Sequence, residues 1–217
     1  MNTVTHHLPT STFVVAAGVL AWLSAVIAAS ASGALAELGR TFMPAYAGLV
    51  ALGIAVPTVL YFTSSSVRKT IEAVGLHRLT LMHAWRVPAA LLFYTYGLRG
   101  ELPAGFWILA GTGDLFAGLY AGTLLFRPPT IELYRRIHLF GFADFVVAVG
   151  TGLTFTLLGD ARMSVLTTLP MALIPLFGVG LSGASHIVAL TRLTRTSPTS
   201  SAAIRPQRRM LSAGRAS

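Results

Sequence analysis

The sequence contains no cysteine. This absence excludes disulfide bridges, thiolate ligands for metals and any mechanism that uses a thiol nucleophile. Charged residues are also scarce, because they make up 11% of the chain, whereas a soluble domain carries about 25%. Acidic residues are the scarcest, with 7 Asp and Glu against 16 Lys and Arg. The composition therefore argues against an ordinary soluble domain.

Long apolar runs fill most of the sequence, which is 54% hydrophobic. Runs of roughly twenty apolar residues cross a bilayer when they are helical. The runs do not alternate apolar with polar residues, as strands of a membrane β-barrel do. We therefore predict an all-α, polytopic membrane protein whose domain, residues 1–193, is a six-helix bundle. The expected spans are residues 12–30, 44–63, 80–98, 103–126, 137–158 and 168–191.

The two ends of the chain differ in charge. Residues 1–11 contain no Lys or Arg, whereas a signal peptide begins with positive charge, so we expect the first span to be retained. Residues 194–217 are rich in Ser, Thr, Arg and Ala, and this composition predicts a disordered basic cytoplasmic tail.

Lys and Arg concentrate in the loops after the second and fourth spans and in the tail. Positive loops stay in the cytoplasm, so we predict that both termini are cytoplasmic and that the protein crosses the cell inner membrane. This topology also explains the formal net charge of +9. The tail lacks the aromatic platforms of a nucleic-acid site. The expected partner is the lipid bilayer, and faces of small residues are also compatible with a homo-oligomer.

The loop after the second span has an amphipathic pattern. Val67, Ile71 and Val74 recur on one helical face, with Ser66 as a candidate N-cap and Gly75 as a candidate C-terminal stop. The pattern predicts a short helix on the cytoplasmic surface, and a solvated loop is the alternative.

Ionisable residues occur inside the predicted spans, where they are costly and usually face the bundle interior. They are Arg86, Asp114, Asp144, His83 and His186, with His138 near the start of the fifth span. Small residues flank both aspartates and His186 at helical spacing, and such residues let helices approach closely. We therefore predict a common polar pocket, open toward the cytoplasm, with Asp114 at its floor.

The charges in this pocket predict distinct roles. Arg86 stays protonated and is expected to pair with Asp144, which lies at a similar depth. Asp114 is then left without a permanent partner, and can bind a proton or another cation. The alternative is a buried ion pair with a purely structural role. Pro88 and Pro175 are expected to break their helices beside the pocket.

Residues 111–114 read Gly-Thr-Gly-Asp. This motif resembles the GxGD motif of intramembrane aspartyl proteases and prepilin peptidases, which implies an aspartate pair that activates water. Asp144 would be the second aspartate, but in those families the partner precedes the motif. An intramembrane aspartyl hydrolase is therefore kept as an alternative, with no catalytic residue assigned.

The histidines allow a cofactor hypothesis. His83 and His186 lie on different spans at similar depths, an arrangement that permits haem b ligation. A haem-binding or structural membrane subunit is therefore a further alternative. His83, His138, His186 and the aspartates show no diagnostic metal-ligand spacing, so no metal site is predicted.

Several segments are together similar to an uncharacterised family of small bacterial six-span integral membrane proteins. The resemblance covers roughly half of the chain and implies that these polar positions matter, without implying an activity. The matching segments are residues 83–86, 102–106, 111–114, 138–144 and 173–175, followed by His186.

We conclude from the sequence that the leading hypothesis is a small proton-linked transporter or permease for an unidentified solute or ion. Asp114 is the expected proton or cation site, Arg86 and Asp144 the gating pair, and His83 and His186 accessory proton carriers. Arg86 is also a candidate for binding an anionic substrate.

Overall fold

The computed structural model of the chain describes residues 10–195. Within this range the protein consists of helices and turns, with no strand, so the all-α prediction is confirmed. The predicted tail, residues 194–217, lies almost entirely outside the described residues. The elements are α1 (Thr10–Ala31), α2 (Ala34–Thr63), α3 (Ser65–Leu81), η1 (Met82–Trp85), α4 (Arg86–Leu98), α5 (Ala104–Gly122), η2 (Thr123–Leu125), α6 (Ile131–Leu157), η3 (Ala161–Thr167), the π-helical turn η4 (Ile174–Gly178) and α7 (Val179–Arg195).

Within residues 10–195, five helical segments are long and apolar enough to cross a membrane. They are Thr12–Ala31, Ala34–Thr63, Ala104–Leu125, Ile131–Leu157 and Ile174–Arg195. The third predicted span, residues 80–98, is not one continuous helix, because the 3₁₀ turn η1 separates α3 from α4. The count of six continuous spans is therefore not confirmed.

Local sequence explains how this broken segment forms. Ser64, rather than the predicted Ser66, caps α3 by accepting a hydrogen bond from the backbone N–H of Val67 at 3.4 Å. Gly75 interrupts α3 with a φ of 79°, a conformation that glycine adopts without a steric penalty. Farther along, η1 ends just before Pro88, whose ring disfavours regular helix in the preceding turn. The second predicted break also occurs, since Pro175 lies in the π-helical turn η4.

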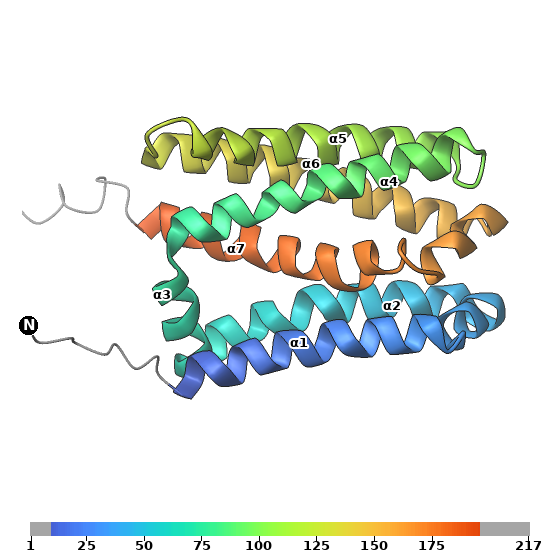
Figure 1. Cartoon of the computed structure of the whole chain (residues 1–217), viewed down its shortest axis with the longest axis horizontal. Helices are drawn as coiled ribbons and strands as arrows, with labels where there is room; N and C mark the ends of the chain where they lie inside the picture. Colours follow the sequence, from blue (N-terminus) through green and yellow to red (C-terminus); the bar gives the residue numbers. More distant parts are fainter. Residues whose placement is uncertain (1–9, 196–217) are drawn as a thin grey trace, which may run out of the picture.

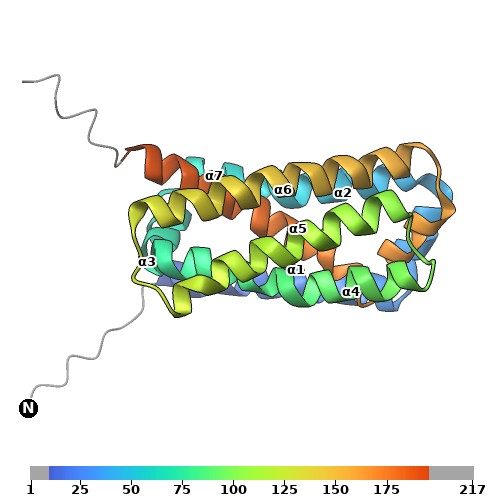
Figure 2. The ribbon, with the colours of Figure 1, turned by 90° about the horizontal axis from the view of Figure 1, so that it is seen from above.

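The helices lie along one long axis, with α7 in the middle (Figure 1). On one side α7 packs against α2, and on the other it packs against α6. Figure 2 shows α4, α5 and α6 side by side, with α5 in contact with both neighbours. The start of α1, the short α3 and the end of α7 lie at one end of the bundle (Figure 1), which we call the α3 end. The opposite end, called the η3 end, carries the turn between α1 and α2 and the 3₁₀ helix η3.

Large apolar side chains cover much of the outer surface. Phe13, Val14 and Leu20 of α1 and Phe116 and Leu119 of α5 are all more than half exposed. Of the 18 most apolar consecutive residues of α1, only 6% are buried inside the protein. Exposed apolar surface of this extent is unfavourable in water and matches a lipid environment.

Candidate functional site

One guanidinium group joins three helices in the interior of the bundle. Arg86, the first residue of α4, donates from Nε to Asp114 Oδ1 of α5 at 2.6 Å. Its Nη2 donates to Asp144 Oδ2 of α6, and its Nη1 donates to the carbonyl oxygen of Gly141 at 3.3 Å. The Arg86 side chain is 3% exposed and both carboxylates are 8% exposed. We call Arg86, Asp114 and Asp144 the charged triad.

Two glycines make room for these side chains. A Cβ atom on Gly113 would overlap the Asp144 carboxylate, so α5 and α6 can approach this closely only with glycine at that position. A Cβ atom on Gly141 would lie 2.9 Å from His186 Nε2 and 3.5 Å from Arg86 Nη1. The first glycine admits the ion pair, and the second admits the histidine ring beside it.

Three buried histidines lie beside the charged triad, and we call them the histidine cluster. His83 of η1, His138 of α6 and His186 of α7 are each at most 1% exposed. The rings of His83 and His186 stack, with centroids 4.0 Å apart, and the His138 ring is perpendicular to both. His138 Nδ1 lies 3.0 Å from His186 Nδ1.

Hydrogen bonds fix the protons on His138 and His186. Thr80 Oγ1 donates to the carbonyl oxygen of Leu76 at 2.7 Å, so it must accept from His138 Nε2 at 2.9 Å. In a neutral ring, His138 Nδ1 then carries a bare lone pair and accepts from His186 Nδ1. The remaining nitrogen, His186 Nε2, is therefore unprotonated, and it has no hydrogen-bond partner among the described residues.

The same reasoning applies to His83. Ser185 Oγ donates to the carbonyl oxygen of Ser182 at 2.9 Å, so it accepts from His83 Nε2 at 2.9 Å. His83 Nδ1 is then a bare lone pair, and it also lacks a partner within residues 10–195. These hydrogen bonds are compatible with three neutral rings, each of which donates its one N–H, so the histidines add no charge beside the triad.

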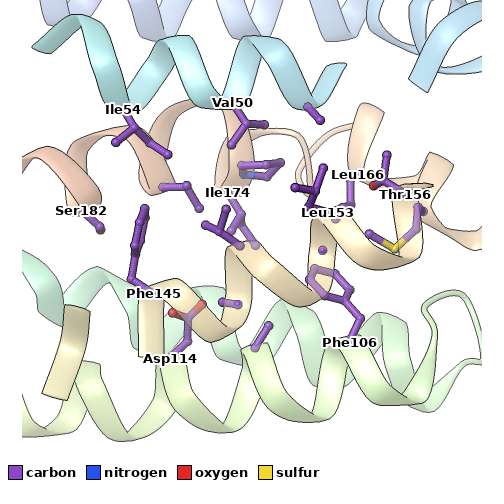
Figure 3. A pocket seen from close by; sticks show the side chains of 18 of the residues that line it. Val50, Ile54, Phe106, Asp114, Phe145, Leu153, Thr156, Leu166, Ile174 and Ser182 are labelled. Carbon is purple, nitrogen blue, oxygen red and sulfur yellow. The ribbon is translucent and has the colours of Figure 1, made fainter. Parts of the chain in front are cut away.

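A cavity of about 190 Å³ begins at the charged triad. Arg86 and Asp114 line its inner end, and the lining continues to Phe106, Thr156 and Leu166. Figure 3 shows Val50 and Ile54 of α2 across the cavity from Asp114 and Phe106 of α5. Apart from Arg86 and Asp114, the walls are mostly aliphatic and aromatic. The cavity therefore presents one charged end to an otherwise apolar space.

The cavity does not extend toward the α3 end, which carries the basic loop after the second predicted span and at which the sequence predicted that the pocket would open. The lining runs from Asp114 toward Thr156 and Leu166, at the η3 end. On the α3 side of the triad the interior is filled by the histidine rings and by Thr80 and Ser185. Along the bundle axis, the histidine cluster comes first from the α3 end, the charged triad follows, and the cavity lies beyond it.

The structure brings together all five predicted site residues, but it changes one pairing. Asp114 was expected to lack a partner, yet Arg86 contacts both aspartates. Sequence reasoning left His138 out of the site and missed Thr80 and Ser185. The available signal was the spacing of His138 and Gly141, which lie one helical turn apart on the buried face of α6.

The geometry argues against both alternative chemistries. An aspartyl hydrolase needs two carboxylates that share a proton, whereas the Arg86 guanidinium bonds to both Asp114 and Asp144. A bis-histidine haem needs a porphyrin between its two ligands, whereas the His83 and His186 rings stack directly on each other. These residues therefore do not fit a haem.

Comparison with known proteins shows the family to which the chain belongs. Residues 41–194 match the family described as a domain of unknown function (DUF8737), and the chain belongs to it. The match includes every residue of the charged triad and of the histidine cluster, but not α1. No curated protein and no solved structure matches the chain.

Proposed function

We propose that this member of the DUF8737 family is a small proton-linked transporter of the bacterial cytoplasmic membrane, which exchanges protons for small cations with an apolar body. The observation that carries the proposal is the charged triad at the inner end of an apolar cavity. One guanidinium faces two carboxylates there, and all three side chains are buried.

Charge counting supports an exchangeable proton. With both aspartates ionised, the triad carries one negative charge in excess. A single charge at membrane depth costs about 2.5–3.5 kcal/mol on insertion scales. The neighbouring histidines do not offset it, because their hydrogen bonds are those of three neutral rings. The low-energy states of the site are therefore those in which one carboxylate holds a proton or a bound cation.

The contacts of Arg86 favour a cationic solute over an anionic one. Its Nε and Nη2 bond to carboxylates and its Nη1 to the Gly141 carbonyl oxygen, so an anion would have to displace one of these groups. The lining also contains Trp85, Phe106 and Phe145, and aromatic faces attract cations.

The volume of the cavity limits the apolar body of the solute to about the size of one six-membered ring. An engineered apolar cavity of about 150 Å³ in another protein binds benzene, and the volume here is about 190 Å³. Small aromatic or branched ammonium ions fit this description. Their charged group would lie at Asp114 and their apolar body would extend toward Phe106 and Leu166.

Coupling then follows from competition for one carboxylate. Asp114 lines the cavity, so it is the group at which proton and solute compete, while Asp144 stays paired with Arg86 as the gating pair. When the solute binds, the proton leaves, and the reverse exchange resets the site. His83 and His186 serve as accessory proton carriers toward the α3 end.

The proposed topology has six crossings. Residues 76–98, which follow the break at Gly75, are long enough at about 1.5 Å per residue to cross a bilayer of about 30 Å as a broken helix. An even number of crossings agrees with α1 beginning at the same end of the bundle at which α7 ends (Figure 1). Because the basic loops stay in the cytoplasm, the α3 end faces the cytoplasm in this topology.

The experiment uses proteoliposomes that contain a trapped pH-sensitive dye and the full chain. Benzyltrimethylammonium is the cationic probe, with phenylacetate as the anion and benzyl alcohol as the neutral molecule. We expect only the cation to drive a proton flux, and Asp114→Asn to abolish that flux.

Asp160→Asn is the matched control, because this carboxylate lies in the turn after α6 and pairs with Arg162 at the surface. A flux with phenylacetate alone would contradict the solute class, and an unchanged flux in Asp114→Asn would contradict the role of Asp114.

A further inference from the structure

We propose that His83, His138 and His186 form a binding site for one first-row transition-metal ion. The sequence predicted no metal site, because the three residues are far apart in the chain and show no recognised spacing. In the structure, one ring nitrogen from each histidine lies within 4.8 Å of those of the other two. This inference does not depend on the proposed transport function, and a bound ion would replace the accessory proton-carrying role of His83 and His186.

The first support is the state of the ring nitrogens. The hydrogen bonds leave bare lone pairs on His83 Nδ1, His138 Nδ1 and His186 Nε2, and a metal ligand must be such an unprotonated nitrogen. His83 Nδ1, one of the ligand atoms in the proposed site, is buried without a hydrogen-bond partner among the described residues. Unpartnered buried polar atoms are uncommon and call for a ligand that satisfies them.

The second support is the set of groups behind the rings. A histidine that binds a metal usually donates its other N–H to a protein acceptor, which orients the ring. Thr80 Oγ1 accepts from His138 Nε2 and Ser185 Oγ accepts from His83 Nε2, each at 2.9 Å. These bonds orient two of the three rings before any ion arrives.

The spacing requires only a local adjustment. Metal–nitrogen bonds of about 2.0–2.1 Å in a tetrahedral site place the nitrogens roughly 3.3 Å apart. His138 Nδ1 and His186 Nδ1 are 3.0 Å apart. A shift of the His186 proton from Nδ1 to Nε2 keeps the ring neutral and frees both Nδ1 atoms for one ion. The stacked His83 ring must tilt so that its bare Nδ1 turns toward the same point.

The neighbouring charges place the ion on the Nδ1 side of the cluster. Arg86 Nη1 lies close to the Gly141 backbone beside His186 Nε2, where a second positive charge would be repelled. The carboxylates of Asp114 and Asp144 exceed this guanidinium by one negative charge. The excess favours a cation nearby, provided that it does not lie directly against Arg86.

The donor set selects the class of ion. Three neutral imidazoles suit zinc, copper, nickel or iron, whereas Mg²⁺ and Ca²⁺ prefer oxygen ligands. A three-histidine site also leaves a fourth position open for water or another small ligand. The expected occupant is therefore a late first-row ion, with Zn²⁺ and Cu⁺ as the probes of the test.

The test measures metal binding by the full chain in nanodiscs, purified through a tag without histidine and stripped with a chelator. Equilibrium dialysis against Zn²⁺, and against Cu⁺ under reducing conditions, is followed by elemental analysis. We expect about one ion per chain. His83→Asn, His138→Asn and His186→Asn should each weaken binding by at least about tenfold, and Ser185→Ala and Thr80→Val by roughly tenfold to a hundredfold.

Two controls isolate the cluster. His77→Gln alters an exposed histidine whose Nδ1 contacts Tyr134 Oη instead, and should bind as the wild type does. A His6→Gln/His7→Gln variant removes the adjacent histidine pair near the N-terminus, which lies outside the described residues. Because variants in a buried cluster can unfold, X-ray absorption on the wild-type protein provides an independent readout, with imidazole nitrogens expected around the ion. The proposal is overturned if neither ion binds to the wild type, if binding is lost in the variant without His6 and His7, or if absorption shows oxygen ligands only.

Discussion

Asp114 and Asp144 lie on different helices and accept hydrogen bonds from the same side chain, the guanidinium of Arg86. The two carboxylates share the Arg86 guanidinium as their cationic partner, and both are almost fully buried. The arrangement joins α4, α5 and α6 through one group and leaves one negative charge in excess. Both the stability of the bundle and the proposed exchange of protons depend on this relationship.

The first prediction concerns the loss of the cation. Arg86→Met removes the partner of two buried carboxylates, and breaking a buried ion pair on one side destabilises a protein by about 3–5 kcal/mol. Neutralising both carboxylates in addition, by Asp114→Asn and Asp144→Asn, should restore a large part of the stability. Unfolding of the single and triple variants in mixed detergent micelles measures the difference. Equal instability of the two variants would show that the guanidinium acts through packing rather than charge.

The second prediction concerns the close approach of the helices. Gly113→Ala places a methyl group on the Asp144 carboxylate, and Gly141→Ala places one on the His186 ring, so each should lower the thermal stability. Gly150→Ala on α6 is the matched control, because no described atom lies within 4 Å of its added Cβ. It should be neutral or slightly stabilising, since alanine favours helix over glycine by about 1 kcal/mol. A thermal-shift assay in detergent compares the three, and tolerance of Gly113→Ala would contradict the observed packing of α5 on α6.

The third prediction concerns the cavity. Ala148 of α6 lines it, so Ala148→Phe should fill part of the space and abolish cation-driven proton flux while the bundle stays folded. Val146→Phe adds a ring on the same helix at a side chain that is 54% exposed, and should transport as the wild type does. The dye assay in proteoliposomes reports both variants. If both keep full flux, the solute does not pass through this cavity.

The fourth prediction concerns topology. The chain has no cysteine, so a single introduced thiol can be labelled without background. In intact cells, a membrane-impermeant maleimide should label Ala161→Cys at the η3 end. It should label Pro128→Cys, in the loop between η2 and α6, only after the cells are opened. The reverse pattern would place the η3 end, and with it the cavity, on the cytoplasmic side.

The sequence predicted the fold class well because apolar runs and helical spacing are local signals. It also indicated that Arg86, Asp114 and Asp144 share an interior, since both aspartates lie on faces of small residues and charged groups at membrane depth usually face the bundle interior. The break in the third predicted span, residues 80–98, was harder to foresee. Pro88 predicted a break there, but whether the interrupted segment still counts as one helix depends on the conformation of Gly75 and on the 3₁₀ turn at residues 82–85.

The histidine cluster shows where sequence reasoning ends. His83, His138 and His186 are separated by about fifty residues each, and their contact depends on how three helical segments pack. The Asp114 pairing was missed for a related reason. Depth along a helix was used to match Arg86 with one aspartate, whereas a guanidinium can donate in several directions at once.

The central claim is that the charged triad holds one exchangeable proton, which a cationic solute displaces. Infrared difference spectroscopy of the purified protein in lipid tests it directly, because a protonated carboxylic acid has a carbonyl band that an ionised one lacks. We expect one such band in the wild type near neutral pH, its loss in Asp114→Asn and Asp144→Asn, and its retention in Asp160→Asn. Benzyltrimethylammonium should also remove the band in the wild type. A wild-type spectrum without this band, or with one that benzyltrimethylammonium leaves unchanged, would contradict the account.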